Sequence, residues 1–305
     1  MTPAPSPYVL LSGACGTELE RRGARTPLPL WSARALLDAP DVVREVHRDY
    51  VRAGASVVTA NTFRADRRTL AKAGLAMRAR DLVRTAVRLA REGVAAAAPS
   101  HEVLVAGSVA PLEDCFRPDL APADADLRTE HAMRAGDLVA AGADLALVET
   151  MNTIREAVAA LGACRAGRLP AAVSFTCAAG ATLLSGEAVA DAVAAVRPYG
   201  PLAILVNCCA LDVADEALSA LVAHAGTLPV GVYANGLGRP DDVAGWRFED
   251  GHGADRAAYR RAAAGWLDAG ARWIGGCCGT TPAYVADLRE LLDERIAAAA
   301  RREGP

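Results

Sequence analysis

Two adjacent cysteines, Cys277 and Cys278, follow an apolar run that begins at Arg272, and glycines flank the pair on both sides. Successive residues of a regular strand point to opposite faces, whereas glycine permits backbone angles at which both thiols can turn toward one centre. A third thiol is available upstream, where the apolar run that begins at Leu202 ends at Cys208. Three thiolates with an open fourth position are the pattern expected of a catalytic zinc ion, so the sequence predicts a Zn²⁺ site.

Four other cysteines have simpler interpretations. Cys115, Cys164 and Cys177 are expected to be small buried or loop hydrophobes, and Cys15 lies in a loop near the candidate site. The chain has eight cysteines, and its first residues do not form the pattern of a secretory signal. We therefore expect a cytoplasmic protein whose thiols serve chemistry or packing.

Short β-branched runs alternate with longer segments that carry apolar residues at helical spacing. The expected strands are residues 8–12, 56–60, 103–107, 144–149, 171–176, 202–207, 230–234 and 272–276. The expected helices include 41–53, 67–97, 123–141, 153–166, 186–196 and 256–269, with a tail helix from 282 to about 300, and 237–255 is the longest irregular segment. This alternation favours an α/β fold, a (β/α)8 TIM barrel that spans residues 1–305 as a single domain.

Polar residues follow the C-terminal ends of the expected strands. They are Ser12, Asn61, Thr62, Ser108, Glu149, Thr150, Thr176, Cys177, Asn207, Cys208, Asn235, Cys277 and Cys278. In a barrel these ends converge on one face, where active sites are built. Any single residue of the set could be a turn residue or a helix cap, but a set with three thiols and a carboxylate indicates an active site.

These motifs resemble the homocysteine S-methyltransferase family, the zinc-dependent group that includes betaine-homocysteine methyltransferase and the homocysteine module of cobalamin-dependent methionine synthase. The resemblance covers nearly the whole chain. Its most specific parts are Val206-Asn-Cys208 and Gly275-Gly-Cys-Cys-Gly-Thr280. Weaker parts are residues 16–20, 50–55, 60–63, 106–111, 148–150 and 173–176.

The resemblance implies that Cys208, Cys277 and Cys278 are the zinc ligands and carry the catalysis. Cys209 is then spare, and on a strand it would point away from Cys208, which favours a packing role over a fourth ligand. Glu149 matches the family carboxylate that holds the amino group of homocysteine. The alternative for Glu149 is an ion pair with a nearby arginine.

The remaining substrate contacts are also implied by the resemblance. Asn207 and Ser108 would orient the site loops, backbone amides around Gly13 would receive the acceptor's carboxylate, and Asn61 is a further candidate for substrate binding. The family usually carries Asp-Gly-Gly at the first strand end, where this chain has Ser12-Gly-Ala. Because one charge expected near the homocysteine ammonium is missing, a different thiol or selenol acceptor remains an alternative.

The implied reaction moves a methyl group from a sulfonium donor to the thiolate of homocysteine and forms methionine. S-methylmethionine is the preferred donor and S-adenosylmethionine the next. The chain ends soon after its last expected helix, so it resembles the short members of the family, without the C-terminal extension of the betaine enzymes and without cobalamin or folate modules. The expected partners are therefore these small-molecule substrates.

Composition limits the other classes of partner. A formal net charge of −3 argues against nucleic acid, and no apolar run approaches the roughly 18 residues needed to span a bilayer. We expect a soluble monomer or small homo-oligomer. Two other classes stay open: a lyase or phosphate-site isomerase with Gly275 and Gly276 as an anion cradle, and a non-catalytic thiol- or zinc-binding regulator. Of the five histidines, only His252 is a candidate for a chemical role.

Overall fold

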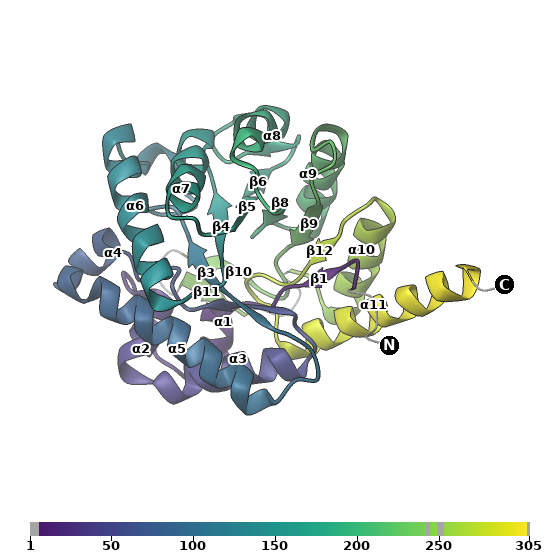
Figure 1. Cartoon of the computed structure of the whole chain (residues 1–305), viewed down its shortest axis with the longest axis horizontal. Helices are drawn as coiled ribbons and strands as arrows, with labels where there is room; N and C mark the ends of the chain where they lie inside the picture. Colours follow the sequence, from purple (N-terminus) through teal and green to yellow (C-terminus); the bar gives the residue numbers. More distant parts are fainter. Residues whose placement is uncertain (1–5, 242–244, 249–252, 304–305) are drawn as a thin grey trace.

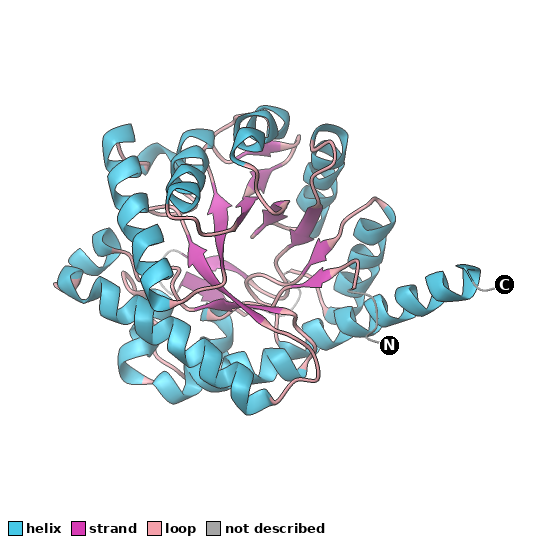
Figure 2. Cartoon of the chain, viewed as in Figure 1, coloured by secondary structure: helices cyan, strands magenta, loops and turns pink. Residues whose placement is uncertain are grey.

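A parallel sheet curls into a barrel at the centre of the molecule, and helices surround it (Figure 1, Figure 2). The computed structural model describes residues 6–241, 245–248 and 253–303. The barrel strands are β1 (Val9–Leu10), β2 (Val57–Ala60), β3 (Leu104–Val109), β4 (Leu145–Met151), β5 (Ala171–Phe175), β8 (Ile204–Asn207), β9 (Val230–Tyr233) and β12 (Trp273–Ile274). Their spatial order is β1-β12-β9-β8-β5-β4-β3-β2, and a parallel bridge between Leu11 and Val57 joins the two ends. The predicted (β/α)8 barrel is confirmed.

The outer ring consists of amphipathic helices whose apolar faces pack on the strands. The helices are α1 (Gly16–Arg21), α2 (Ala35–Asp38), α3 (Pro40–Arg52), α4 (Arg67–Ala71), α5 (Ala79–Ala97), α6 (Asp124–Ala141), α7 (Ile154–Ala166), α8 (Val189–Val196), α9 (Leu211–His224), α10 (Arg256–Asp268) and α11 (Pro282–Glu303). Short 3₁₀ helices span Trp31–Arg34, Ala76–Arg78, Pro118–Leu120 and Arg197–Tyr199. Within the described ranges, no helix has the length and apolar character required to cross a membrane.

The structure corrects three expected boundaries. The helix predicted over 67–97 is divided into α4, a 3₁₀ turn and α5, because Gly74 adopts a left-handed conformation (φ 71°) that ends the helical hydrogen bonding. The helix predicted from 186 begins at Val189, since Gly186 is also left-handed (φ 86°). The segment 237–255 contains a hairpin of β10 (Arg239–Asp241) and β11 (Gly245–Arg247), and His252 lies outside the described residues.

The barrel interior is filled by alternate residues of the strands. Side chains of a strand point alternately to its two faces, so Leu145 and Leu147 of β4 face inward while Ala146 and Val148 pack against the helices. The inward set is Leu11, Val57, Ala106, Leu145, Leu147, Ala172, Ala203, Leu205, Tyr233 and Trp273. This apolar layer packs beneath the residues at the C-terminal ends of the strands and supports them.

Candidate active site

The uppermost inward-facing layer of the barrel is polar. Two residues after the apolar positions Ala106, Leu147, Ala172 and Leu205 come Ser108, Glu149, Ser174 and Asn207, and all four polar side chains are buried. Because the spacing of two keeps them on the inward face, four neighbouring strands deliver polar groups to the same end of the barrel. Asn207 joins this layer: its Oδ1 accepts hydrogen bonds from Ser174 Oγ at 2.6 Å and the Thr150 amide at 3.0 Å.

The sulfurs of Cys208, Cys277 and Cys278 meet above this layer. Their Sγ atoms all lie within 4.8 Å of one another, and those of Cys208 and Cys278 are 4.0 Å apart. Sulfurs that bind one tetrahedral zinc ion at about 2.3 Å are separated by about 3.8 Å. The donor set and its spacing therefore fit a zinc ion with little rearrangement.

Backbone geometry turns the thiols inward. Cys208 has a left-handed conformation (φ 56°), which is unfavourable for a residue with a Cβ, and it allows Asn207 and Cys208 to face the same end of the barrel. Strand β12 ends at Ile274, so Cys277 and Cys278 lie in the following loop rather than on a strand. Gly279 is required there, because its φ is 78° and a Cβ would approach the Leu237 carbonyl to 2.1 Å.

The electrostatics of the cluster favour a cation. Hydrogen bonds from Cys208 and Cys278 hold the pKa of Cys277 well below its usual range, and the amide of Asn207 also donates to its sulfur, at 3.8 Å. The same hydrogen bond to Cys277 raises the pKa of Cys208 well above its usual range. Without a metal ion the cluster thus stabilises one thiolate by leaving its neighbours protonated. A divalent cation would allow all three to ionise.

The other cysteines lie apart from this cluster. Cys209 is buried in the core between strands and helices, as are Cys164 and Cys177. Cys115 and Cys15 line the cavity described next, and burial raises the pKa of each thiol to about 12. None of these five has the thiolate character of Cys277.

A cavity of about 560 Å³ opens above the sulfurs. Its buried end is formed by Ser12, Ser108, Glu149, Thr150, Cys208 and Tyr233 together with Cys277 and Cys278. Its other end carries Leu28, Trp31, Phe63, Arg64, Asp114 and Phe116, of which Leu28, Asp114 and Phe116 are exposed. The cavity therefore has room for two small substrates between a polar, thiol-rich end and an aromatic mouth.

Glu149 is a buried carboxyl without a cationic partner. Its Oε1 accepts a hydrogen bond from Ser108 Oγ, and its Oε2 accepts one from Tyr233 Oη at 3.3 Å. No arginine in the described part of the chain lies within ion-pair distance of it, so the alternative of an internal ion pair is not observed. Burial raises the pKa of Glu149 to about 7, although the hydrogen bond from Ser108 opposes the shift. A ligand ammonium would supply the missing charge.

The loop after β1 is fixed by neighbours. Ser12 lines the cavity, and its Oγ accepts a hydrogen bond from the Thr59 amide at 3.2 Å. A Cβ on Gly13 would come within 2.7 Å of the Tyr50 ring, so glycine is required for this close approach. The Ala14 amide already donates to Thr280 Oγ1 at 3.3 Å. A substrate carboxylate at this loop would have to use its other amides.

Asn61 follows strand β2 and is fixed by one hydrogen bond. Its Nδ2 donates to the Ser32 carbonyl at 2.8 Å, which fixes the side chain, while its buried Oδ1 has no partner. Asn61 also lines the cavity. A buried acceptor without a partner is costly, so a donor on the substrate would stabilise it.

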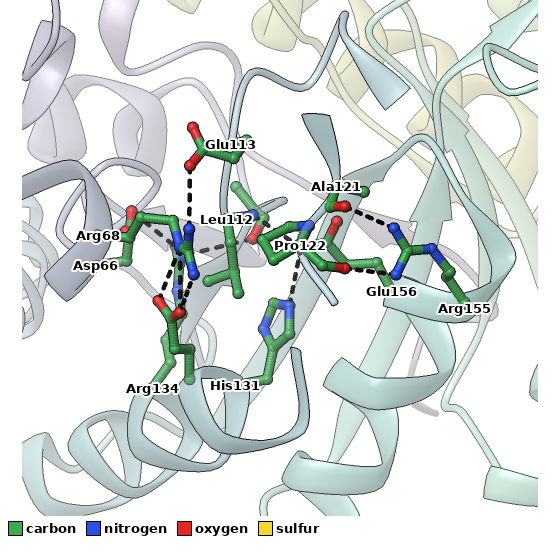
Figure 3. Close-up of polar contacts among 12 residues, drawn as sticks. Asp66, Arg68, Leu112, Glu113, Ala121, Pro122, His131, Arg134, Arg155 and Glu156 are labelled. Carbon is green, nitrogen blue, oxygen red and sulfur yellow. Dashed lines mark hydrogen bonds and ion pairs between the residues drawn. The ribbon is translucent and has the colours of Figure 1, made fainter. Parts of the chain in front are cut away.

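Arg134, which none of the sequence motifs indicated, organises the site from outside the barrel. Figure 3 shows His131 and Arg134 extending from α6 toward the segments that follow β2 and β3. Arg134 Nη2 donates to the carbonyls of Thr62, Phe63 and Ser108 at 2.9, 2.9 and 3.1 Å, and only 4% of its surface is exposed. Ser108 in turn donates to Glu149, so Arg134 links the segments after β2 and β3 to the Glu149 carboxyl.

A signal for Arg134 exists in the sequence. Leu127, His131, Arg134 and Leu138 recur at helical spacing, and all four are buried on one face of α6. A charged residue in such an apolar stripe indicates a buried partner. His131 has one as well, since its Nε2 lies 3.1 Å from Oε1 of Glu156 (Figure 3).

Arg134→Met is expected to lower the free energy of unfolding by about 2–5 kcal/mol, because buried carbonyls lose a charged donor. Urea denaturation would measure the change. Arg155→Met is the matched control: Arg155 also donates to two carbonyls, those of Ala121 and Pro122, but 42% of its side chain is exposed, so water can replace it (Figure 3). Equal losses in the two variants would contradict a special role for Arg134.

The barrel and its three-thiol cavity together define a (β/α)8 enzyme with a candidate metal site at the C-terminal ends of the strands. The chain belongs to the homocysteine S-methyltransferase family, whose model matches residues 9–292, and it is a methyltransferase. This membership favours the methyltransferase over the lyase and regulator interpretations.

Two sequence matches and one structural match illustrate the relationship. Homocysteine S-methyltransferase of Escherichia coli (strain K12) is 37% identical over 296 residues, which cover 92% of this chain and 94% of the relative. The crystal structure of the metallated form of the homocysteine methyltransferase MmuM from Escherichia coli has a TM-score of 0.81 at 34% identity and covers 94% of this chain and 97% of that one. Selenocysteine Se-methyltransferase of Brassica oleracea var. italica is 28% identical over an alignment of 314 positions, which covers 94% of this chain and 90% of the relative.

Proposed function

We propose that the protein transfers a methyl group from a sulfonium donor, S-methylmethionine or S-adenosylmethionine, to the thiolate of homocysteine, with a zinc ion held by Cys208, Cys277 and Cys278. The observation that carries this proposal is the convergence of three thiols within 4.8 Å at the end of a cavity that also contains the unpaired Glu149. The crystal structure of the related MmuM in a metallated form supports the presence of a metal ion.

When bound, zinc would keep the acceptor sulfur deprotonated at neutral pH, where a free thiol with a pKa of about 8.5 is mostly protonated. Glu149 would pair with the acceptor's ammonium, and Asn61 lines the same cavity. Asn207 holds Cys277 and Thr150 in place through its amide. These contacts orient the acceptor, which is the protein's main contribution to the transfer.

The methyl-transfer step itself moves no proton, so it needs no general base. A lone pair of the acceptor thiolate forms the new S–C bond, the C–S⁺ bond of the donor breaks, and its electron pair stays on the donor sulfur. One negative and one positive sulfur thus become two neutral thioethers, and the acceptor's thiol proton has already left to solvent. The reaction requires the two sulfurs and the methyl carbon to be collinear, with the acceptor sulfur about 3–3.5 Å from the methyl carbon.

A panel of methyl donors assayed with homocysteine by mass spectrometry tests the proposal. S-methylmethionine and S-adenosylmethionine should give methionine, and betaine should give at most a small fraction of their rate, because its leaving group is not a thioether. Comparable turnover with betaine would contradict the donor assignment.

A second acceptor is favoured by Ser12. The position lines the same cavity as Glu149 but carries no charge. If Glu149 alone neutralises the homocysteine ammonium, homocysteine should bind more weakly than in a site with two carboxylates. The alternative is an adaptation to another thiol or selenol that lacks a free α-ammonium.

Ser12→Asp is expected to lower the KM for homocysteine about 10- to 100-fold and to leave zinc content unchanged, since one added charged hydrogen bond is worth about 1.5–3 kcal/mol. The new carboxylate can keep the hydrogen bond from Thr59 that Ser12 now accepts. Ser12→Asn, without the charge, is the control. Steady-state kinetics with homocysteine distinguish the two accounts of Ser12. If the native enzyme uses homocysteine efficiently and Ser12→Asp does not change the KM, both accounts are refuted.

A further inference from the structure

The mouth of the cavity carries groups that the acceptor does not use. Trp31 and Phe63 pack edge to face with ring centroids 6.1 Å apart, and Phe116 is exposed nearby on the loop after β3. The guanidinium carbon of Arg64 lies 5.6 Å from the centre of the Phe63 ring. This end of the cavity therefore combines aromatic surface with charged side chains, among them the Arg64 guanidinium.

Arg64 is only partly satisfied by the protein. Its Nη1 donates to the Glu113 carbonyl over a long 3.4 Å, and its buried Nε has no hydrogen-bond partner. No carboxylate of the described segments lies within ion-pair distance of it, whereas the nearby Arg67 pairs with Asp137 at 2.6 Å. Arg64 also lines the cavity, so a half-buried guanidinium with no carboxylate partner among the described residues lies at its wall.

The two substrates must occupy different parts of the cavity. The acceptor sulfur has to reach the three cysteines, and its ammonium has to reach Glu149, which is at the buried end. The donor approaches with its sulfonium methyl toward that sulfur, so the rest of the donor extends toward the mouth. Sulfonium amino acids carry an α-carboxylate on this trailing part.

We propose that Arg64 binds the α-carboxylate of the methyl donor and makes the enzyme selective for sulfonium amino acids over sulfonium compounds without that charge. This inference rests on the proposed function. A guanidinium offers parallel N–H groups that match a carboxylate, and pairing in a partly desolvated cavity stabilises both charges. The stacking of Arg64 on Phe63 holds the guanidinium in place before the donor arrives.

The test compares S-methylmethionine with its amide, in which a neutral carboxamide replaces the carboxylate, at saturating homocysteine. For the native enzyme, kcat/KM for S-methylmethionine should exceed that for the amide about 10- to 100-fold. In Arg64→Gln this ratio should fall close to one through a higher KM for S-methylmethionine, with kcat little changed. Arg64→Lys, which keeps the charge, should restore part of the ratio.

Arg67→Gln is the matched control, since Arg67 is close in sequence and pairs with Asp137 outside the cavity. It should keep the native ratio. A ratio unchanged by Arg64→Gln would overturn the inference, and so would a selective rise in the KM for homocysteine, which would assign Arg64 to the acceptor. Failure of the native protein to use either S-methylmethionine or S-adenosylmethionine would instead refute the proposed function and this inference with it.

Discussion

Cys277→Ala and Cys208→Ala are expected to lose bound zinc and methyl transfer together. Each substitution removes one of three sulfurs that lie within 4.8 Å of one another, and two thiolates hold the ion far less tightly than three. Because a metal ion contributes several kcal/mol to such a reaction, activity should fall by about 1,000-fold or more. Elemental analysis of the purified variants and methionine formation from homocysteine measure the two effects.

Cys209→Ala is the control for this expectation. Cys209 adjoins Cys208 in sequence but packs in the core between strands and helices, so the variant should keep its metal and most of its activity. It should lose some stability, because a buried sulfur is removed. If Cys209→Ala strips the metal and Cys208→Ala does not, the assignment of the ligands is wrong.

Glu149→Gln is expected to raise the KM for homocysteine about 10- to 100-fold. The substitution keeps the size of the side chain and its contacts with Ser108 and Tyr233, but it removes the buried negative charge that is proposed to pair with the acceptor's ammonium. A charged hydrogen bond in this setting is worth about 1.5–3 kcal/mol. Zinc content should not change. Steady-state kinetics with varied homocysteine measure the effect, and an unchanged KM would exclude Glu149 from acceptor binding.

The pH dependence provides a second measurement on Glu149. Burial raises the pKa of this carboxyl from 4.5 to about 7, so in the free protein it becomes protonated as the pH falls below 7 and no longer attracts an ammonium. The native kcat/KM for homocysteine should therefore fall below pH 7 more steeply than that of Glu149→Gln. The difference between the two profiles isolates this group from the thiols.

The raised pKa also predicts the sign of a stability change. Between pH 4.5 and about 7 the folded free protein binds more protons at Glu149 than the unfolded chain does, so the free energy of unfolding falls as the pH rises through this window. Above about pH 7 Glu149 is ionised in both states, and its full destabilising contribution is present. Glu149→Gln should remove this contribution and be more stable than the native protein at pH 8, in chemical denaturation without ligands.

The sequence by itself determined the barrel and the thiols that its strands deliver. Alternation with a period of two and helical spacing are local properties, so they predict which residues face inward. The carboxyl ends of parallel strands meet at one face whatever the details of packing, so Cys208, Cys277 and Glu149 could be assigned to one region. The chemistry of three thiols then indicated a soft metal ion.

Only the tertiary structure decided how these groups are partnered. The left-handed backbone at Cys208, the absence of an arginine beside Glu149 among the described residues, and the unsatisfied Arg64 depend on contacts between segments far apart in the chain. Arg134 on α6 reaches carbonyls 26 and 72 positions away, and Asn207 reaches Cys277 across 70. Burial and hydrogen bonding across such separations arise when the barrel closes. No local sequence pattern encodes these contacts, because the packing of all the strands and helices determines which residues meet.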